Sequence, residues 1–159
     1  MHLAAISLYA FVAVSSALRI ESANPAFGAA GRRGCLTVLT PTLNAPVVIW
    51  DCNLTVEQNW TYAPAGAPNS VGQPIKLFGT KCLDVKDGAN ADGTKLQMYD
   101  CFNQAPNQQW VVNTDTTFQW AGTNKCIDLT NGSITNGNQL QISTCDRNNA
   151  NQRYYSTPV

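Results

Sequence analysis

The stretch 82–110, CLDVKDGANADGTKLQMYDCFNQAPNQQW, recurs without a gap 44 residues later as 126–154, CIDLTNGSITNGNQLQISTCDRNNANQRY. Both copies open on Cys, a hydrophobic residue and Asp, contain a central Leu-Gln, and close on Asn-Gln-x-aromatic after a second cysteine. A more diverged copy comes first at 35–60, which begins Cys-Leu-Thr-Val and ends Gln-Asn-Trp. Repeats of this length predict one structural unit used three times.

Each copy contains short runs in which apolar and polar residues alternate between Gly, Asn, Asp and Pro, a pattern typical of strands. We expect strands at 18–20, 75–78, 82–85, 95–99, 109–113, 117–120, 126–129, 139–143 and 153–156. No sustained helical period occurs after the N-terminal segment. Three repeats of four strands predict a twelve-stranded, all-β chain that must close on itself to hide its edges.

The six cysteines predict one disulfide in each repeat. Fifteen pairings are formally open, but the cysteines occupy equivalent places in the repeats, with separations of 17, 19 and 19 residues. The expected bonds are Cys35–Cys52, Cys82–Cys101 and Cys126–Cys145. Closing a loop of this size stabilises a fold by about 3 kcal/mol in the chain-entropy model.

The N-terminus has the pattern of a secretory signal. An apolar run at 3–14 is followed by Ser15-Ser16-Ala17, with small residues at the two positions that a signal peptidase inspects. Removal of residues 1–17 also removes His2, the only histidine. A chain without histidine builds neither a Ser-His-Asp site nor a His-ligated metal centre. We therefore expect a secreted mature domain at 18–159 with no catalytic residues, cofactor or metal.

The amino-acid composition limits the classes of partner that this chain is expected to bind. Only 13% of residues are charged, with 10 Lys and Arg against 10 Asp and Glu. Nucleic-acid binding draws most of its affinity from a basic patch, and a polybasic membrane anchor needs the same charge, so we expect neither partner. No later apolar stretch is long enough to insert into a membrane. Asn, Gln and Thr supply the polarity instead, which suits a neutral polar ligand.

The Cys-Leu-Asp-Val, Leu-Gln-Met-Tyr-Asp-Cys and Asn-Gln-Gln-Trp motifs of 82–110, in tandem with two related copies, resemble the ricin B-type lectin family. The resemblance covers 18–159 and implies a β-trefoil with pseudo-threefold symmetry. Its repeats would lie at about 18–66, 73–115 and 116–159. It also implies a lectin for galactose-type or related pyranosides, with glycans or glycoproteins as partners.

The family pattern implies a sugar site in the middle repeat. In the family, the Asp of the first motif and the Asn before Gln-x-Trp bind hydroxyl groups, and the aromatic residue two places before the second cysteine covers the apolar sugar face. Carboxylate and amide groups suit hydroxyls, and an aromatic ring suits the C–H face of a pyranose. The matching residues, with Gln108 in a mainly supporting role, are Asp84, Gln97, Tyr99, Asn107 and Gln108.

The other repeats depart from this pattern. The third has the hydrogen-bonding residues Asp128, Gln141, Asn151 and Gln152, but Ser143 stands where the aromatic platform belongs. We expect a weak or an inactive site there.

In the first repeat, Trp50 supplies a platform, but Thr37 replaces the Asp and Glu57 the Asn. We expect no sugar site of this kind there.

The triplets that close the repeats are expected to be structural. Their aromatic residues, Trp60, Trp110 and Tyr154, are expected in the core. Their glutamines, Gln58, Gln108 and Gln152, are expected to bond to nearby backbone groups. Trp120, in an alternating strand, is also expected in the core.

Two other function classes are compatible with a small β-trefoil chain but fit this sequence less well. A β-trefoil protease inhibitor could act through an exposed loop such as 63–74, but an inhibitor has no reason to repeat Asp and Asn-Gln at equivalent places. A glycoside hydrolase needs two carboxylates facing each other across a sugar. Asp84, Asp87 and Asp92 lie in a turn-rich segment, where such residues are ordinary.

Several questions stay open at the level of sequence. Glycosylation sequons begin at Asn53, Asn59 and Asn131. Arg32-Arg33 is either a dibasic processing site or part of a solvated hairpin loop, and we favour the loop because cleavage would discard the first strand. The bound sugar, the biological target and the oligomeric state are not determined.

Overall fold

The computed structural model describes residues 17–63 and 72–159. The predicted signal segment, apart from Ala17, and most of the 63–74 stretch lie outside these residues. Within the described part of the chain, no helix combines the length and the apolar character needed to cross a membrane.

Short strands make up most of the regular structure of the described residues. They are β1 (Leu18–Ser22), β2 (Gly34–Thr37), β3 (Val48–Asp51), β4 (Lys76–Leu77), β5 (Lys81–Val85), β6 (Leu96–Asp100), β7 (Trp110–Val112), β8 (Phe118–Trp120), β9 (Lys125–Asp128), β10 (Gln141–Thr144) and β11 (Tyr154–Pro158). One α-helix, α1 (Pro25–Ala29), and five single-turn 3-10 helices lie in the connections: η1 (Val56–Gln58), η2 (Lys86–Gly88), η3 (Pro106–Gln108), η4 (Thr130–Gly132) and η5 (Ala150–Gln152).

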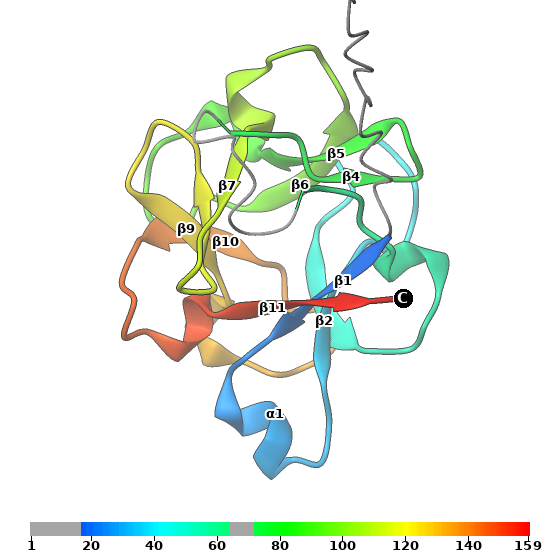
Figure 1. Ribbon diagram of the computed structural model, residues 1–159, viewed down its shortest axis with the longest axis vertical. Helices are drawn as coiled ribbons and strands as arrows, with labels where there is room; N and C mark the ends of the chain where they lie inside the picture. The colour runs from blue at the N-terminus through cyan, green and yellow to red at the C-terminus, as the bar shows by residue number, and fades with distance from the viewer. Residues whose placement is uncertain (1–16, 64–71) are drawn as a thin grey trace, which may run out of the picture.

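The strands form three antiparallel sheets, ordered β11-β1-β2-β3, β4-β5-β6 and β10-β9-β8-β7. Figure 1 shows the sheets grouped around the molecule, with β1 and β11 side by side. Each repeat is joined to the next: a bridge links Thr61 to Lys76, β7 pairs with β8, and β11 returns to β1. The chain therefore closes on itself, and the arrangement is the predicted β-trefoil.

Two details differ from the sequence-based expectation. The fourth strand of the first repeat, which would complete the twelve, is reduced to Trp60 and Thr61, and these residues form isolated bridges rather than a ladder. The helix α1 was not predicted, because five residues are too few to show a helical period. Its local signals are Asn24, whose Oδ1 accepts from the Ala26 N–H at 2.9 Å, and Pro25 at the first helical position.

The aromatic residues that close the repeats fill the core, as predicted. Trp60 and Trp110 are 0% exposed and Tyr154 is 1% exposed. The indole N–H of Trp60 donates to the Leu36 carbonyl at 2.9 Å, and that of Trp110 to the Leu83 carbonyl at 3.1 Å. These bonds satisfy the polar end of each buried ring, so that its apolar area contributes fully to stability. Trp120 is also buried.

The three disulfides are Cys35–Cys52, Cys82–Cys101 and Cys126–Cys145, the pairing that the repeats predict. Each bond joins the second strand of its repeat to the turn after the third strand. It therefore fixes the place where the Gln-x-aromatic triplet packs.

Arg32 and Arg33 lie between α1 and β2, in a connection as expected, but they are tied to the fold. Arg32 donates from Nε to Asp51 Oδ1 at 2.6 Å, and its hydrogen bond holds the pKa of the Asp51 carboxyl below its usual value. Arg33 Nη1 lies 3.4 Å from Glu21 Oε2. These contacts connect the dibasic pair to β1 and β3.

Candidate functional site

The glutamine of each Gln-x-aromatic triplet is buried and bonded to backbone. Gln108 donates from Nε2 to the Asp100 carbonyl at 2.8 Å and accepts at Oε1 from the Phe102 N–H at 3.0 Å. Gln58 and Gln152 make the equivalent pair of bonds in the other repeats. The glutamines therefore hold the turn after the second cysteine, as predicted for them.

Gln108 also reaches the carboxylate of Asp84. Asp84 lies on β5 opposite Gln97 of β6, and it is only 4% exposed. Its Oδ1 accepts from Gln97 Nε2 at 2.9 Å and its Oδ2 from Gln108 Nε2 at 3.0 Å. Burial raises the pKa of Asp84 above its ordinary value, and the two amide bonds oppose that rise. Each oxygen is oriented by one amide and has capacity to accept from a ligand hydroxyl.

The hollow in front of Asp84 has a volume of about 310 Å³ and is lined by Asn44, Asp84, Asp87, Gln97, Tyr99 and Asn107. The structure thus brings together four of the five residues named from the sequence, while Gln108 lies behind Asp84. Asn44 and Asp87 were missed. Asn44 belongs to the first repeat, and its N–H donates to the Met98 carbonyl at 2.9 Å. Only the packing of one repeat against the next places it there.

Asp87 has a local signal in the sequence, the Asp-Gly pair, and its turn also positions the predicted site residue Asn107. Asp87-Gly88 forms a tight turn in η2, with positive φ at both residues, and such turns favour Asp-Gly. A Cβ at Gly88 would lie 2.6 Å from Asn107 Oδ1, so glycine at this place lets the asparagine side chain pack against the turn. The turn therefore fixes Asn107 at the edge of the hollow.

Tyr99 forms the wall of the hollow. It follows Gln97 by two residues on β6, so both side chains lie on the same face of the strand. The ring is half-buried, and its centroid lies 6.1 Å from that of Phe102 at an interplanar angle of 40°. Two carboxylates, three amides and a half-buried aromatic ring together suit a pyranose, which offers hydroxyl groups at its edge and C–H groups on its face.

The third repeat has the same arrangement around Asp128, a buried carboxylate held by two glutamines, which we call the frame of the site. Its Oδ1 accepts from Gln141 Nε2 at 3.1 Å and its Oδ2 from Gln152 Nε2 at 3.2 Å. Burial raises the pKa of Asp128, against the effect of these two bonds. Ser143, on the next strand position of the same face, provides no ring.

Two further groups occupy the hydrogen-bonding capacity of the third repeat. Lys95 of the second repeat donates from Nζ to Gln141 Oε1 at 3.2 Å and to Thr130 Oγ1 at 3.0 Å. Asn151 accepts at Oδ1 from Asn24 Nδ2 at 2.7 Å. Lys95 forms an isolated β-bridge with Gln141 of the third repeat, and Pro46 forms the equivalent bridge with Gln97 of the middle repeat. The middle site therefore has a proline at the position where the third site has a lysine.

The first repeat has no carboxylate at this place. Thr37 Oγ1 accepts from Gln58 Nε2 at 2.9 Å and donates to the Cys35 carbonyl at 3.0 Å, which uses its bonding capacity internally. Trp50 lies beside Gly137, where an added Cβ would be 3.8 Å from the ring. The platform is present, but the acceptor for sugar hydroxyls is not.

The family model for the ricin-type β-trefoil lectin domain matches residues 27–154. The chain belongs to this lectin family. A ribosome-inactivating protein of Sambucus nigra, SNAIf, is 44% identical to the lectin over 41 residues, which is 26% of this chain and 7% of that protein. The lectin therefore matches less than a tenth of the length of this curated relative.

Solved structures resemble the lectin in fold. The agglutinin from Abrus precatorius has a TM-score of 0.72 at 20% identity, over 95% of this chain and 51% of that one. The C-half of an earthworm R-type lectin, in complex with GalNAc, has a TM-score of 0.67 at 13% identity, over 91% of this chain and 99% of that one.

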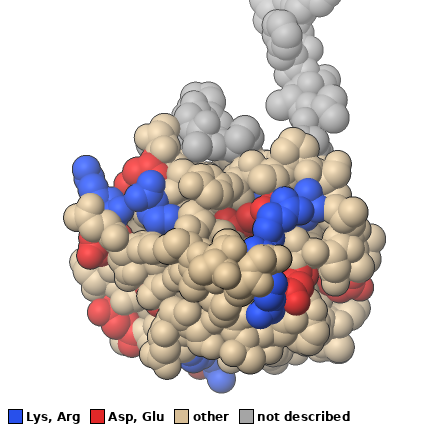
Figure 2. All heavy atoms as spheres, turned by 90° about the horizontal axis from the view of Figure 1, so that it is seen from below, with Lys and Arg blue, Asp and Glu red and all other residues tan. Residues whose placement is uncertain are grey.

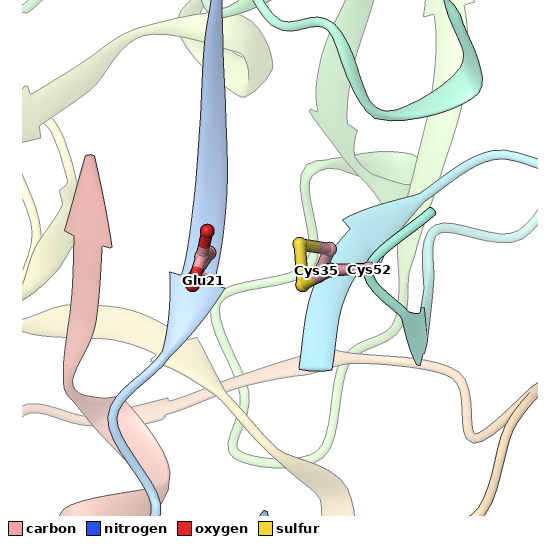
Figure 3. A group of neighbouring side chains, drawn as sticks. All are labelled: Glu21, Cys35 and Cys52. Carbon is pink, nitrogen blue, oxygen red and sulfur yellow. A yellow bond between two sulfur atoms is a disulfide. The ribbon is translucent and has the colours of Figure 1, made fainter. Parts of the chain in front are cut away.

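One cluster of the lectin has a metal-like composition. Among the described residues, Glu21, Cys35 and Cys52 are the group of three with ligand atoms within 4.8 Å of one another. Figure 3 shows the two cysteine sulfurs bonded to each other, with Glu21 on the neighbouring strand. Disulfide sulfurs are not thiolate ligands, so this cluster is not a metal centre.

The face of the lectin seen in Figure 2 carries few charges. Lys and Arg are scattered there among Asp, Glu and a majority of uncharged residues. No broad basic patch of the kind that binds a phosphate backbone is present on that face.

Proposed function

We propose that this lectin binds galactose-type or related pyranosides through its middle repeat, without catalysing a reaction. The observation that carries the proposal is the Asp84 carboxylate, which is buried, oriented by Gln97 and Gln108, and open to the hollow beside Tyr99. Asp84 and Asn107 would bind adjacent hydroxyls, and Tyr99 would cover the C–H face of the sugar. The GalNAc complex of the earthworm R-type lectin supports a galactose-type ligand.

One open site of this size implies weak binding. We expect a dissociation constant of about 1 mM for a simple sugar, which corresponds to about −4 kcal/mol. A single functional site on a monomer would not agglutinate cells, so tight attachment to a surface would require clustered glycans or self-association.

We propose further that the lectin is secreted and carries N-glycans. Three disulfides fit an oxidising compartment. Of the three sequon asparagines, Asn53 and Asn131 are exposed, whereas the Oδ1 atom of Asn59 is buried. We expect glycans at the two exposed asparagines and not at Asn59.

The test is glycan-array binding of the mature protein beside two matched variants, Asp84→Ala and Asp128→Ala. Both variants remove a buried carboxylate that accepts from two glutamines, and Asp128→Ala also removes a bond from Asn149 Nδ2 at 3.4 Å. Far-UV circular dichroism would confirm that all three proteins are folded. We expect selective binding that Asp84→Ala abolishes and Asp128→Ala leaves intact.

Two other results of the glycan-array experiment would change or overturn the proposal. Loss of binding in Asp128→Ala alone would move the site to the third repeat. A folded protein that binds no glycan would overturn the lectin proposal, and a protease-inhibition panel would then test the other β-trefoil activity considered for this sequence.

A further inference from the structure

A second hollow lies next to the aromatic platform of the middle repeat. It has a volume of about 390 Å³ and is lined by Pro74, Lys76, Cys101, Phe102, Asn103, Gln104 and Gln109. Phe102 connects it to the first hollow, since the centroid of its ring lies 6.1 Å from that of Tyr99, which lines the Asp84 hollow. The two hollows are therefore neighbours along one surface.

Phe102 is held at this place although it is 60% exposed. Its N–H donates to Gln108 Oε1 at 3.0 Å, and the neighbouring residue Cys101 is bonded to Cys82. An exposed phenylalanine gains little from folding, because most of its apolar area stays in water. The backbone of Phe102 is thus held so that its ring lies in the open beside a sugar platform, where it is suited to bind a second ring.

Lys76 contributes a positive charge to the second hollow. It is half-buried on β4, and in the described residues it forms no ion pair, unlike Lys81 with Asp100 and Lys125 with Asp92. The rest of the lining is neutral, with the amides of Asn103, Gln104 and Gln109. An acidic group in this hollow would gain a charge partner without displacing one.

The pseudo-threefold symmetry supplies an internal comparison. The strand partner of the first cysteine is Lys76 in the middle repeat, Gln119 in the third and Glu21 in the first. A similar hollow in the third repeat is lined by Gln119, Cys145 and Arg147 among others, so the depression itself belongs to the fold. The residue after the second cysteine is Phe102 in the middle repeat, whereas it is Asp146 in the third and Asn53 in the first.

We infer that Phe102 and Lys76 form a second subsite, which binds the next sugar of an oligosaccharide and its carboxylate or sulfate group. The inference rests on the proposed function, because the terminal sugar is taken to lie in the Asp84 hollow. Phe102 covers the face of the second sugar, the amides bind its hydroxyls, and Lys76 binds the acidic substituent. The lectin thus prefers a short acidic glycan to a single neutral sugar.

The experiment measures dissociation constants by titration calorimetry for galactose, N-acetyllactosamine, N-acetyllactosamine sulfated on its glucosamine, and galactose β-linked to glucuronic acid. The mature lectin is compared with Phe102→Ala, Lys76→Gln and the matched control Arg147→Gln. We expect the neutral disaccharide to bind about fivefold tighter than galactose, and an acidic disaccharide to gain up to about fivefold more. The sulfate and the glucuronate probes show which acid is preferred.

The variants separate the contributions. Phe102→Ala should remove the gain of the disaccharides and leave the galactose constant unchanged, and Lys76→Gln should remove only the acidic gain. Arg147→Gln should change none of the constants. Three results would overturn the second subsite while leaving the proposed function standing. One is a gain in disaccharide affinity that survives Phe102→Ala. The others are a gain in affinity for acidic disaccharides that is absent from the parent lectin or that survives Lys76→Gln. Failure of galactose and of every array glycan to bind would overturn the proposed function itself.

Discussion

At the scale of single residues, the Asp84 side chain must meet two opposing requirements, burial and negative charge. Its carboxylate must be buried enough to be oriented by Gln97 and Gln108, and charged enough to accept from sugar hydroxyls. Burial is the larger influence on its pKa, which is raised, so this carboxyl takes up a proton at a higher pH than an ordinary aspartate.

Sugar affinity should therefore fall on acidification before ordinary aspartates are protonated. The charged form binds hydroxyls through both oxygens, and protonation removes acceptor capacity. The effect on stability has the opposite sign: a raised pKa favours the protonated folded state, so this contribution is present at low pH and is lost as the pH rises through the pKa of the folded protein. Calorimetric affinities from neutral to acidic pH would test the first effect, with circular dichroism to follow folding.

Asp84→Asn is the control for this pH dependence. It cannot ionise at this position, so we expect weak binding that lacks the Asp84 contribution to the pH dependence. Affinity of the parent lectin that stays constant until the ordinary aspartate range would contradict the raised pKa.

At the scale of elements, each sugar frame is completed by a connection from the preceding repeat. The β2–β3 connection brings Asn44 to the middle hollow, and the segment before β6 brings Lys95 to the third repeat. The two frames share the bonds from two glutamines to a buried carboxylate. They differ in the neighbouring loop and in the residue at the platform position. In the third repeat, Asn24 also bonds to Asn151, and Asn149 Nδ2 donates to Asp128 Oδ2 at 3.4 Å.

The third frame should gain binding when the Lys95 ammonium group is removed and the aromatic platform is restored. Lys95→Met keeps an unbranched side chain, one atom shorter, but removes the ammonium group from Gln141 and Thr130, and Ser143→Tyr restores the platform. We expect the parent lectin to bind one sugar per chain and the double variant to bind about two, measured as calorimetric stoichiometry at high protein concentration. Ser143→Tyr alone is the matched control, with Lys95 still in place. One sugar per chain in a folded double variant would show that the frame lacks something else.

At the scale of the whole molecule, closure of the trefoil depends on β1. This strand pairs with β11 along its whole length and contributes Leu18 and Ile20 to the core. Arg33 also pairs with Glu21 of the same strand. Processing at the dibasic pair would detach a segment that no disulfide retains.

A chain that begins at Gly34 should therefore fail to fold. Loss of residues 18–33 exposes an edge of β11 and removes three buried apolar side chains, Leu18, Ile20 and Phe27, each worth roughly 1.5–3 kcal/mol. Thermal unfolding followed by circular dichroism would compare it with a chain that begins at Ala17. A cooperative transition at a similar temperature in the shorter chain would revive the processing-site interpretation of Arg32-Arg33.

The sequence by itself determined the repeat, the strand pattern, the disulfide pairing and the aromatic core, because each is encoded at equivalent positions 44 residues apart or in a local period. It also named the residues of the middle repeat that line the hollow, except Asp87. The tertiary structure alone decided what comes from elsewhere: Asn44 at the hollow, Lys95 against Gln141, and Phe102 between two hollows. These contacts join different repeats or depend on surface shape, and neither spacing nor composition records which side chains a closed fold brings together.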